Sequence, residues 1–170
     1  MTKTTETQEV QALFCWESYT INSLDDEISA DRNCQGLLQL FLKYLLENQS
    51  LEPLTAGSHA KGADYFIRDY MIDRCREHIF AITPEKIKGF AGNWYIVNTL
   101  EPNMEELKSL LDGIRMFYLF CDKHDLLKDV NFASIDSACS DATYYQNRIE
   151  DFHNLQDDQY HQWNNNCPVI

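Results

Sequence analysis

The stretch "NMEELKSLLDGIRMFYLFCDKH", residues 103–124, decides the fold, because its apolar residues recur every three or four positions without a gap. That period is typical of an amphipathic α-helix. Asn103 is a favourable N-cap, and Glu106 completes a variant of the capping box. Gly113 stands in mid-helix, where glycine costs about 1 kcal/mol relative to alanine, so we expect a neighbouring segment to approach closely there. The apolar positions are Leu107, Leu110, Leu111, Ile114, Phe117, Tyr118 and Cys121.

Five further segments carry helical patterns, and no segment carries a convincing strand pattern. The helical patterns cover residues 5–19, 31–50, 58–80, 83–98 and 129–155. Thr83 and Pro84 suit the N-cap and the first position of the helix that they begin. Between the helices, residues 22–31 and 50–58 are predicted to be connections. The tail, residues 156–170, has no period, but its apolar and aromatic side chains indicate that it packs on the body: Tyr160, Trp163, Val169 and Ile170.

These patterns predict one all-α domain over residues 1–170, a bundle of about six helices. Within it we expect acidic N-terminal helices over 1–56, a helical core over 57–128, a C-terminal helix over 129–155 and an irregular tail over 156–170. A domain of 170 residues buries enough surface to fold without a disulfide or a metal.

The net charge of −13 lies at the two ends of the chain. Residues 1–56 carry 9 acidic and 3 basic side chains, and residues 129–170 carry 7 and 1. Residues 57–128 are nearly balanced, with 11 acidic and 10 basic side chains. So acidic a chain repels nucleic acid at long range, which leaves the middle segment as the place for a local basic patch.

The chain shows neither an apolar signal-peptide core near its start nor an apolar run of about 18 residues, so we expect a cytoplasmic protein. Its six cysteines would be reduced there. Most of them are predicted to serve as small core residues. No motif calls for a cofactor.

Two Cys-x-x-His pairs raise the possibility of a structural metal site. "CREH" supplies Cys75 and His78, and "CDKH" supplies Cys121 and His124. Residues three apart share a helix face, and zinc takes thiolate and imidazole ligands tetrahedrally. The alternative interpretation is that each pair marks a helix end, with a core cysteine and a histidine that favours the C-terminal dipole. We favour that alternative, because the spacing between the pairs fits no zinc-finger pattern.

Basic residues of the middle segment are candidates for nucleic-acid contacts. Arginines stand among aromatic residues in "DYFIRDYMIDRCR", residues 64–76, as they do in proteins that grip nucleic acid. The alternative is that the acidic residues of the same helix pair with those arginines. The candidates are Arg68, Arg74, Lys86, Lys88, Lys108 and Arg115.

No arrangement of residues points to catalysis. The sequence has no Gly-x-Ser-x-Gly elbow, and no cysteine has a recognisable activating base. Paired carboxylates such as Asp25-Asp26 are expected on a solvated surface in a chain with 27 acidic residues. We therefore expect no catalytic residues.

Residues 58–127 resemble the N-terminal core-binding domain of tyrosine recombinases and phage integrases, a small SAM-like helical bundle. The resemblance lies in "ITPEKIKGF", which is similar to one helix of that family, and in "LLDGIRMFYLF", which is similar to the next. The matching positions are Ile82, Thr83, Ile87, Phe90, Leu110, Leu111, Ile114, Arg115, Phe117 and Tyr118. It implies a DNA-binding fold, but the family's catalytic His-x-x-Arg motif is missing and the segment is charge-balanced rather than basic.

The sequence thus predicts a non-catalytic interaction module that binds a protein partner or a second copy of itself. Nucleic-acid binding, mimicry of DNA by the acidic ends, and a structural metal site remain as alternatives. No membrane association is expected.

Overall fold

The structure of the chain, a computed structural model, describes the backbone of residues 2–167 and the side chains of residues 8–167. Every regular element within residues 2–167 is helical, which confirms the all-α prediction. Across those same residues, no helix combines the length and the apolar character needed to cross a membrane. The elements are α1 (Thr2–Leu13), η1 (Trp16–Tyr19, a 3-10 helix), α2 (Leu24–Glu47), α3 (Pro53–Asp64), η2 (Tyr65–Arg74, a π-helix), α4 (Pro84–Gly89), η3 (Phe90–Trp94, a π-helix), α5 (Tyr95–Asn98), α6 (Met104–Lys123), α7 (Phe132–Cys139), α8 (Ala142–His153) and α9 (Tyr160–Asn165).

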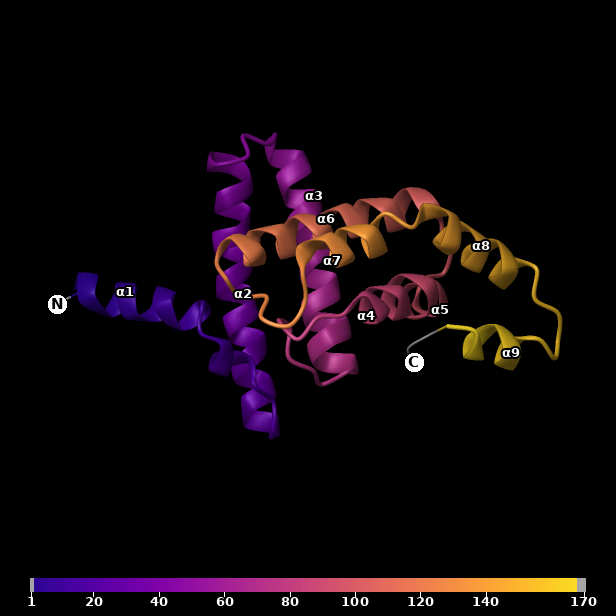
Figure 1. Cartoon of the computed structure of the whole chain (residues 1–170), viewed down its shortest axis with the longest axis horizontal. Coiled ribbons are helices and arrows are strands. Elements are labelled where there is room, and N and C mark those ends of the chain that lie inside the picture. Colours follow the sequence, from indigo (N-terminus) through magenta and orange to yellow (C-terminus); the bar gives the residue numbers. More distant parts are fainter. Residues whose placement is uncertain (1, 168–170) are drawn as a thin grey trace.

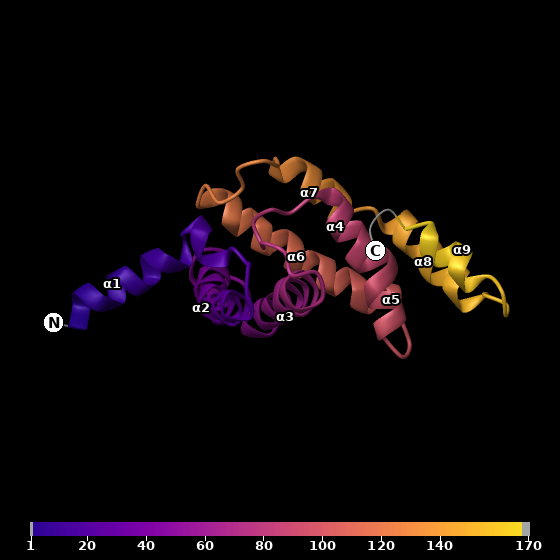
Figure 2. The ribbon, with the colours of Figure 1, turned by 90° about the horizontal axis from the view of Figure 1, so that it is seen from below.

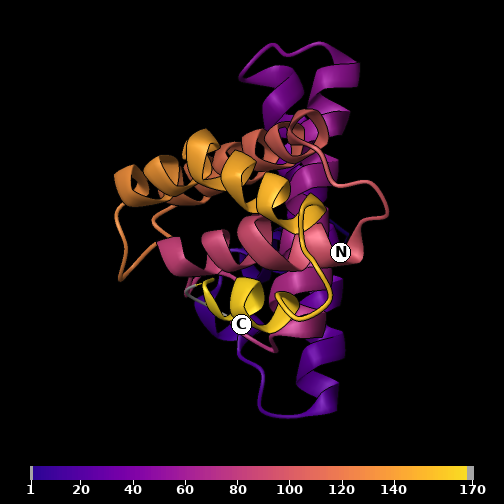
Figure 3. The same cartoon turned by 90° about the vertical axis from the view of Figure 1, so that its right-hand side faces the viewer.

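The molecule is elongated and has two crossed layers (Figure 1). α2 and α3 lie side by side, and α6 and the α4–α5 segment run across them (Figures 1 and 2). α1 projects from one end, while α8 and α9 form the other. Figure 3 looks onto that second end and shows α9 folded back beside the α4–α5 segment. The most extensive helix contact is between α3 and α6.

α6 is the central helix, as its pattern predicts. Asn103 caps it by accepting a hydrogen bond from the Glu106 amide at 2.9 Å. In a capping box the Glu106 side chain would accept a hydrogen bond directly from the Asn103 amide. Here the Tyr95 hydroxyl stands between them: it accepts from the Asn103 amide at 3.2 Å and donates to the Glu106 carboxylate at 2.9 Å. Gly113 permits the expected close approach: a β-carbon there would collide with the His59 carbonyl oxygen on α3.

Two predicted connections, 22–31 and 50–58, are helical over most of their length. α2 begins at Leu24, inside the stretch predicted as a loop, because the Ser23 hydroxyl accepts a hydrogen bond from the Asp26 amide at 3.2 Å. The three acidic residues that follow favour the positive end of the helix dipole. α3 begins at Pro53, a residue well suited to the first helical turn. The acidic run is therefore a helix N-terminus, and the prediction of a connection there is wrong.

The C-terminal part also differs from the prediction. The single helix expected over 129–155 is divided into α7 and α8, because Asp141 caps α8 through the Tyr144 amide at 3.3 Å. The tail expected to be irregular contains α9. Trp163 is buried against the body as predicted, whereas Tyr160 is exposed. Val169 and Ile170 lie outside the described residues.

Arg148 fixes α9 in place. Its guanidinium donates to the Gly92 carbonyl at 2.8 Å and to the Trp163 carbonyl at 2.7 Å, and it lies 3.9 Å from the centroid of the Trp163 ring. Asn93 donates to the Asn164 side chain at 2.8 Å. These bonds join α8, η3 and α9, so the C-terminal helix supports one wall of the site described next.

Candidate functional site

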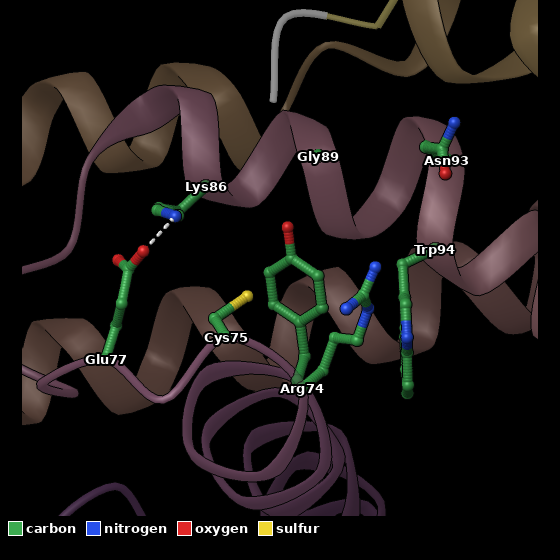
Figure 4. Close-up of a pocket in the computed structure, with 8 residues that line it drawn as sticks. Arg74, Cys75, Glu77, Lys86, Gly89, Asn93 and Trp94 are labelled. Atoms are coloured by element: carbon green, nitrogen blue, oxygen red, sulfur yellow. Dashed lines mark hydrogen bonds and ion pairs between the residues drawn. The ribbon is translucent and has the colours of Figure 1, made fainter. Parts of the chain in front are cut away.

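A pocket of about 250 Å³ lies between the two π-helical segments. Its lining comes from the end of η2, from the loop that follows, and from α4 and η3 (Figure 4). Such segments are rare and are frequently found at functional sites. The lining residues are Tyr70, Arg74, Cys75, Glu77, Lys86, Gly89, Asn93 and Trp94.

Aromatic packing sets the separation of the two segments. Phe90 on η3 is fully buried, and its ring centroid lies 5.1 Å from that of Phe66 and 5.4 Å from that of Tyr70 on η2. Trp94 lies 5.1 Å from Tyr65 and 5.5 Å from Tyr70. These rings hold η2 and η3 farther apart than small residues would, and the pocket opens at the edge of the cluster.

The π-helical turns place the lining residues. At the end of η2 the Cys75 amide donates to the Tyr70 carbonyl, five residues earlier, at 2.9 Å. At the end of η3 the Tyr95 amide donates likewise to the Phe90 carbonyl. A five-residue hydrogen-bond step rotates the following side chains relative to a regular α-helix. The step brings Arg74 and Cys75 to the pocket on one side, and Asn93 and Trp94 on the other.

Two basic side chains face the pocket, and they differ in their partners. The Lys86 ammonium donates to the Glu77 carboxylate at 2.5 Å. Among the residues that the structure describes, no carboxylate is within ion-pairing distance of Arg74, which is exposed. Figure 4 shows Arg74 directed toward the ribbon of α4 and η3, with Trp94 beside it. The pocket therefore carries one uncompensated positive charge.

The ionisable thiol and phenol of the pocket are both protonated at neutral pH. Burial raises the pKa of Cys75, although the nearby Lys86 partly offsets the effect. Burial, together with the adjacent Cys75, raises the pKa of Tyr70 well above its usual range. A cysteine nucleophile needs a lowered pKa. Cys75 is therefore suited to packing, and Tyr70 to hydrogen-bond donation.

The four predicted metal ligands do not form a site. Within residues 8–167 no group of three or more His, Cys, Asp or Glu side chains is arranged to hold a metal. Both ring nitrogens of His78 are already used, since one bonds the Trp16 carbonyl at 2.8 Å and the other accepts from the Phe80 amide at 3.1 Å. Cys121 is fully buried, and burial raises its pKa well above the ordinary value. The described residues therefore give no support to the alternative of a metal site at these two pairs.

The histidines of the two Cys-x-x-His pairs instead pack against aromatic residues of the N-terminal segment. The ring of His78 stacks on Trp16 with centroids 4.1 Å apart, and that of His124 stacks on Phe14 at 4.5 Å. His124 is the C-cap of α6, as the helix-end interpretation predicts. Cys75 is the C-cap of η2, whereas His78 lies in the loop beyond it.

Most of the predicted nucleic-acid contacts are engaged by acidic residues. Arg68 pairs with Asp31 on α2 at 2.7 Å and with Asp64, four residues before it in the chain, at 3.0 Å. Only the second pair is the local one that the sequence predicts. Arg115 pairs with Asp136 on α7.

Two lysines are also paired, while the remaining two candidates are not. Lys86 pairs with Glu77, and Lys88 lies 3.6 Å from Asp141. Within the described residues Arg74 and Lys108 have no such partner. The structure thus brings Arg74, Lys86 and Cys75 together, although sequence reasoning assigned them to different roles.

Sequence reasoning missed the other half of the pocket. Tyr70 and Trp94 occupy apolar positions in the helical patterns over 58–80 and 83–98, and Glu77 lies on the polar side of the first pattern, so none of the three stands out in the sequence. Asn93 was the available signal, because an amide in the middle of the apolar run "FAGNW" must find a buried partner. It is 6% exposed.

Comparisons with models of known protein families, with curated proteins and with solved structures found no match for this chain. The resemblance to integrase core-binding domains stays a prediction.

Proposed function

We propose that the chain is a non-catalytic helical interaction module of the cytoplasm, which recognises a protein partner by receiving one of its side chains in the pocket between η2 and η3. The supporting observation is the pocket itself: about 250 Å³, walled by Tyr70 and Trp94, with an unpaired Arg74 at its mouth. That volume is below the range of about 300–1,000 Å³ typical of small-molecule sites. Tyrosine, tryptophan and arginine are the residue types that dominate binding energy at protein interfaces.

The chemistry of the buried side chains favours binding over catalysis. Burial raises the pKa of Cys75 and of Cys34, and raises that of Cys139 to about 12. These thiols carry no appreciable negative charge at neutral pH, so they are poor nucleophiles. The net charge of −13 opposes association of two copies, which favours a different protein as the partner.

Selection from a displayed random-peptide library tests the proposal. Wild-type protein should enrich peptides with a shared motif, and Cys75→Phe, which fills the pocket from its own wall, should bind them at least tenfold more weakly. Cys15→Phe is the matched control, because Cys15 is also partly buried but lies outside the pocket. The proposal fails if no motif is enriched, or if folded Cys75→Phe binds the selected peptides as well as wild type.

Nucleic-acid binding is the second candidate. Of the six basic residues predicted as contacts, Lys108 and Arg74 are the two that have no ion-pair partner among the described residues. Binding by so few phosphate contacts would depend weakly on salt, since the slope follows the number of contacts. A mobility shift of duplex DNA at micromolar protein and low salt would favour this candidate over protein recognition.

A further inference from the structure

We infer that the group held in this pocket is a monovalent carboxylate, supplied by an Asp or Glu side chain of the partner and bound by Arg74. The inference rests on the proposed function and names the chemistry that the pocket recognises. It follows from the balance of charges and hydrogen-bond donors around the cavity.

The charge balance selects a monoanion. Lys86 and Glu77 neutralise each other at 2.5 Å, so the ligand-facing charge is that of Arg74 alone. A cation would be repelled by Arg74 and would find Glu77 already engaged. A phosphate dianion would bring a second negative charge that nothing in the lining compensates, and it would lie beside Glu77.

The donors match a planar carboxylate. A guanidinium presents parallel N–H groups in a fork that fits both carboxylate oxygens. Tyr70 adds a hydroxyl that stays protonated, because burial and the neighbouring Cys75 raise its pKa. The half-buried Trp94 contributes a flat wall, its ring centroid 5.5 Å from that of Tyr70. Both rings line the same pocket as Arg74, so they would shield part of a carboxylate bound there from water and strengthen the ion pair.

The surroundings also restrict the partner segment. Asp73 is exposed one residue before Arg74, and Glu77 follows it closely. The chain as a whole carries a net charge of −13. A strongly acidic peptide would be repelled, so the recognised segment has one acidic residue among neutral or basic neighbours.

The test is a nuclear magnetic resonance titration of the whole chain with blocked amino acids. The probes are N-acetyl-glutamate amide, its neutral isostere N-acetyl-glutamine amide, and N-acetyl-phosphoserine amide, all at one ionic strength and pH 7. The reporter is the indole N–H of Trp94, assigned with Trp94→Phe. We expect a saturable shift with the glutamate probe, and at least tenfold weaker binding of the other two.

Variants separate the ion pair from general effects. Arg74→Gln should weaken the binding of the glutamate probe at least tenfold, because the substitution removes the positive charge at an exposed position. Lys108→Gln should leave its affinity unchanged. An unaltered amide spectrum away from the pocket shows that each variant is folded.

Several results would overturn the inference. It fails if the glutamate and glutamine probes bind equally well, or if the phosphoserine probe binds more tightly. It also fails if no probe gives a saturable shift, or if Arg74→Gln binds the glutamate probe as well as wild type does. The proposed function is tested separately. Selected peptides that lack any acidic residue, yet lose binding to Cys75→Phe, would support the interaction module and refute the carboxylate.

Discussion

The two halves of one helix, residues 53–74, make opposite kinds of contact. In α3 the small residues Gly62 and Ala63 are buried, and the backbone touches α6 directly. A β-carbon at Gly62 would lie 2.8 Å from the Leu110 carbonyl oxygen. In η2 the side chains that face the neighbouring helix are aromatic, and Phe66 and Tyr70 meet Phe90 ring to ring.

The difference shows how one helix can both anchor a fold and build a site. Where side chains are small, the backbones approach closely and leave no space between the helices. Where side chains are large rings, the helices stand apart and a pocket remains at the edge of the ring cluster. The π-helical hydrogen bonding occurs only in the second half, where the neighbour is held at a distance.

The largest expected effect comes from removing the centre of the aromatic contact. Phe90→Ala should lower the free energy of unfolding by about 3–5 kcal/mol, because Phe90 is fully buried and the cavity left behind cannot collapse well. Phe90→Leu, which keeps most of the volume, should cost less than about 2 kcal/mol. Urea unfolding followed by circular dichroism measures both. Equal losses for the two variants would mean that the volume of the side chain at position 90 is not what stabilises the contact between η2 and η3.

The close contact of α3 with α6 should be nearly as sensitive, but to the addition of atoms. Gly113→Ala should destabilise by about 1–3 kcal/mol, since the added methyl meets the His59 carbonyl and the backbones must separate. Gly57→Ala is the matched control, because a β-carbon at Gly57 on α3 has no neighbour within 4 Å. It should stabilise by up to about 1 kcal/mol through helix propensity. Stabilisation by Gly113→Ala in the same urea assay would contradict the close approach.

The loop after η2 should make the pocket end of the molecule sensitive to acid. Burial lowers the pKa of His78 below its ordinary value of 6.5. The unfolded chain therefore binds the proton first, so the stabilisation by neutral His78 is complete above pH 6.5 and is lost as the pH falls toward the lower folded pKa.

Variant His78→Phe checks that assignment. It keeps a ring to stack on Trp16 but leaves the Trp16 carbonyl and the Phe80 amide without their partner, so it should lose about 1–2 kcal/mol at pH 7. Its stability should also change less than that of wild type between pH 7 and pH 5. Parallel pH profiles of the two proteins would show that another group titrates.

The smallest effect concerns the end of α6. Asp125 has a φ of 56°, in the left-handed region that glycine adopts without steric cost. Asp125→Gly should therefore stabilise by up to about 1 kcal/mol. Asp122→Gly is the control within the regular helix and should destabilise by about the same amount. A shift of both thermal midpoints in one direction would refute the role of backbone conformation.

Local signals were enough for some elements and not for others. The caps at Thr83 and Asn103 and the period of residues 103–124 predicted α4 and α6 correctly, because the information lies within each segment. The prediction places the start of α2 too late, although Ser23 and three acidic residues mark it, because acidic residues are also common in loops. The break before α8 depends on Asp141 acting as a cap inside a continuous apolar period.

The candidate site was less accessible to sequence reasoning. The sequence predicts Arg74 and Lys86 as nucleic-acid contacts and Cys75 as a metal ligand, which are unrelated hypotheses, although all three residues line one pocket. Their meeting depends on contacts between residues 20 to 24 positions apart in the chain, such as the ring pairs of Phe90 with Tyr70 and of Trp94 with Tyr70. The bond from Arg68 to Asp31 likewise joins residues 37 positions apart, whereas its bond to Asp64 is local and was foreseeable.

By itself, the sequence determined that this protein is all helical, that residues 103–124 form its central helix, and that Gly113 faces a close neighbour. Periodicity, caps and glycine act within a few residues, so their consequences can be read locally. Only the tertiary structure decided that two helices become π-helical where aromatic rings hold them apart, and that the gap leaves Arg74 without an acid among the described residues. Burial and charge pairing depend on every segment that packs nearby, and no single stretch of sequence contains them.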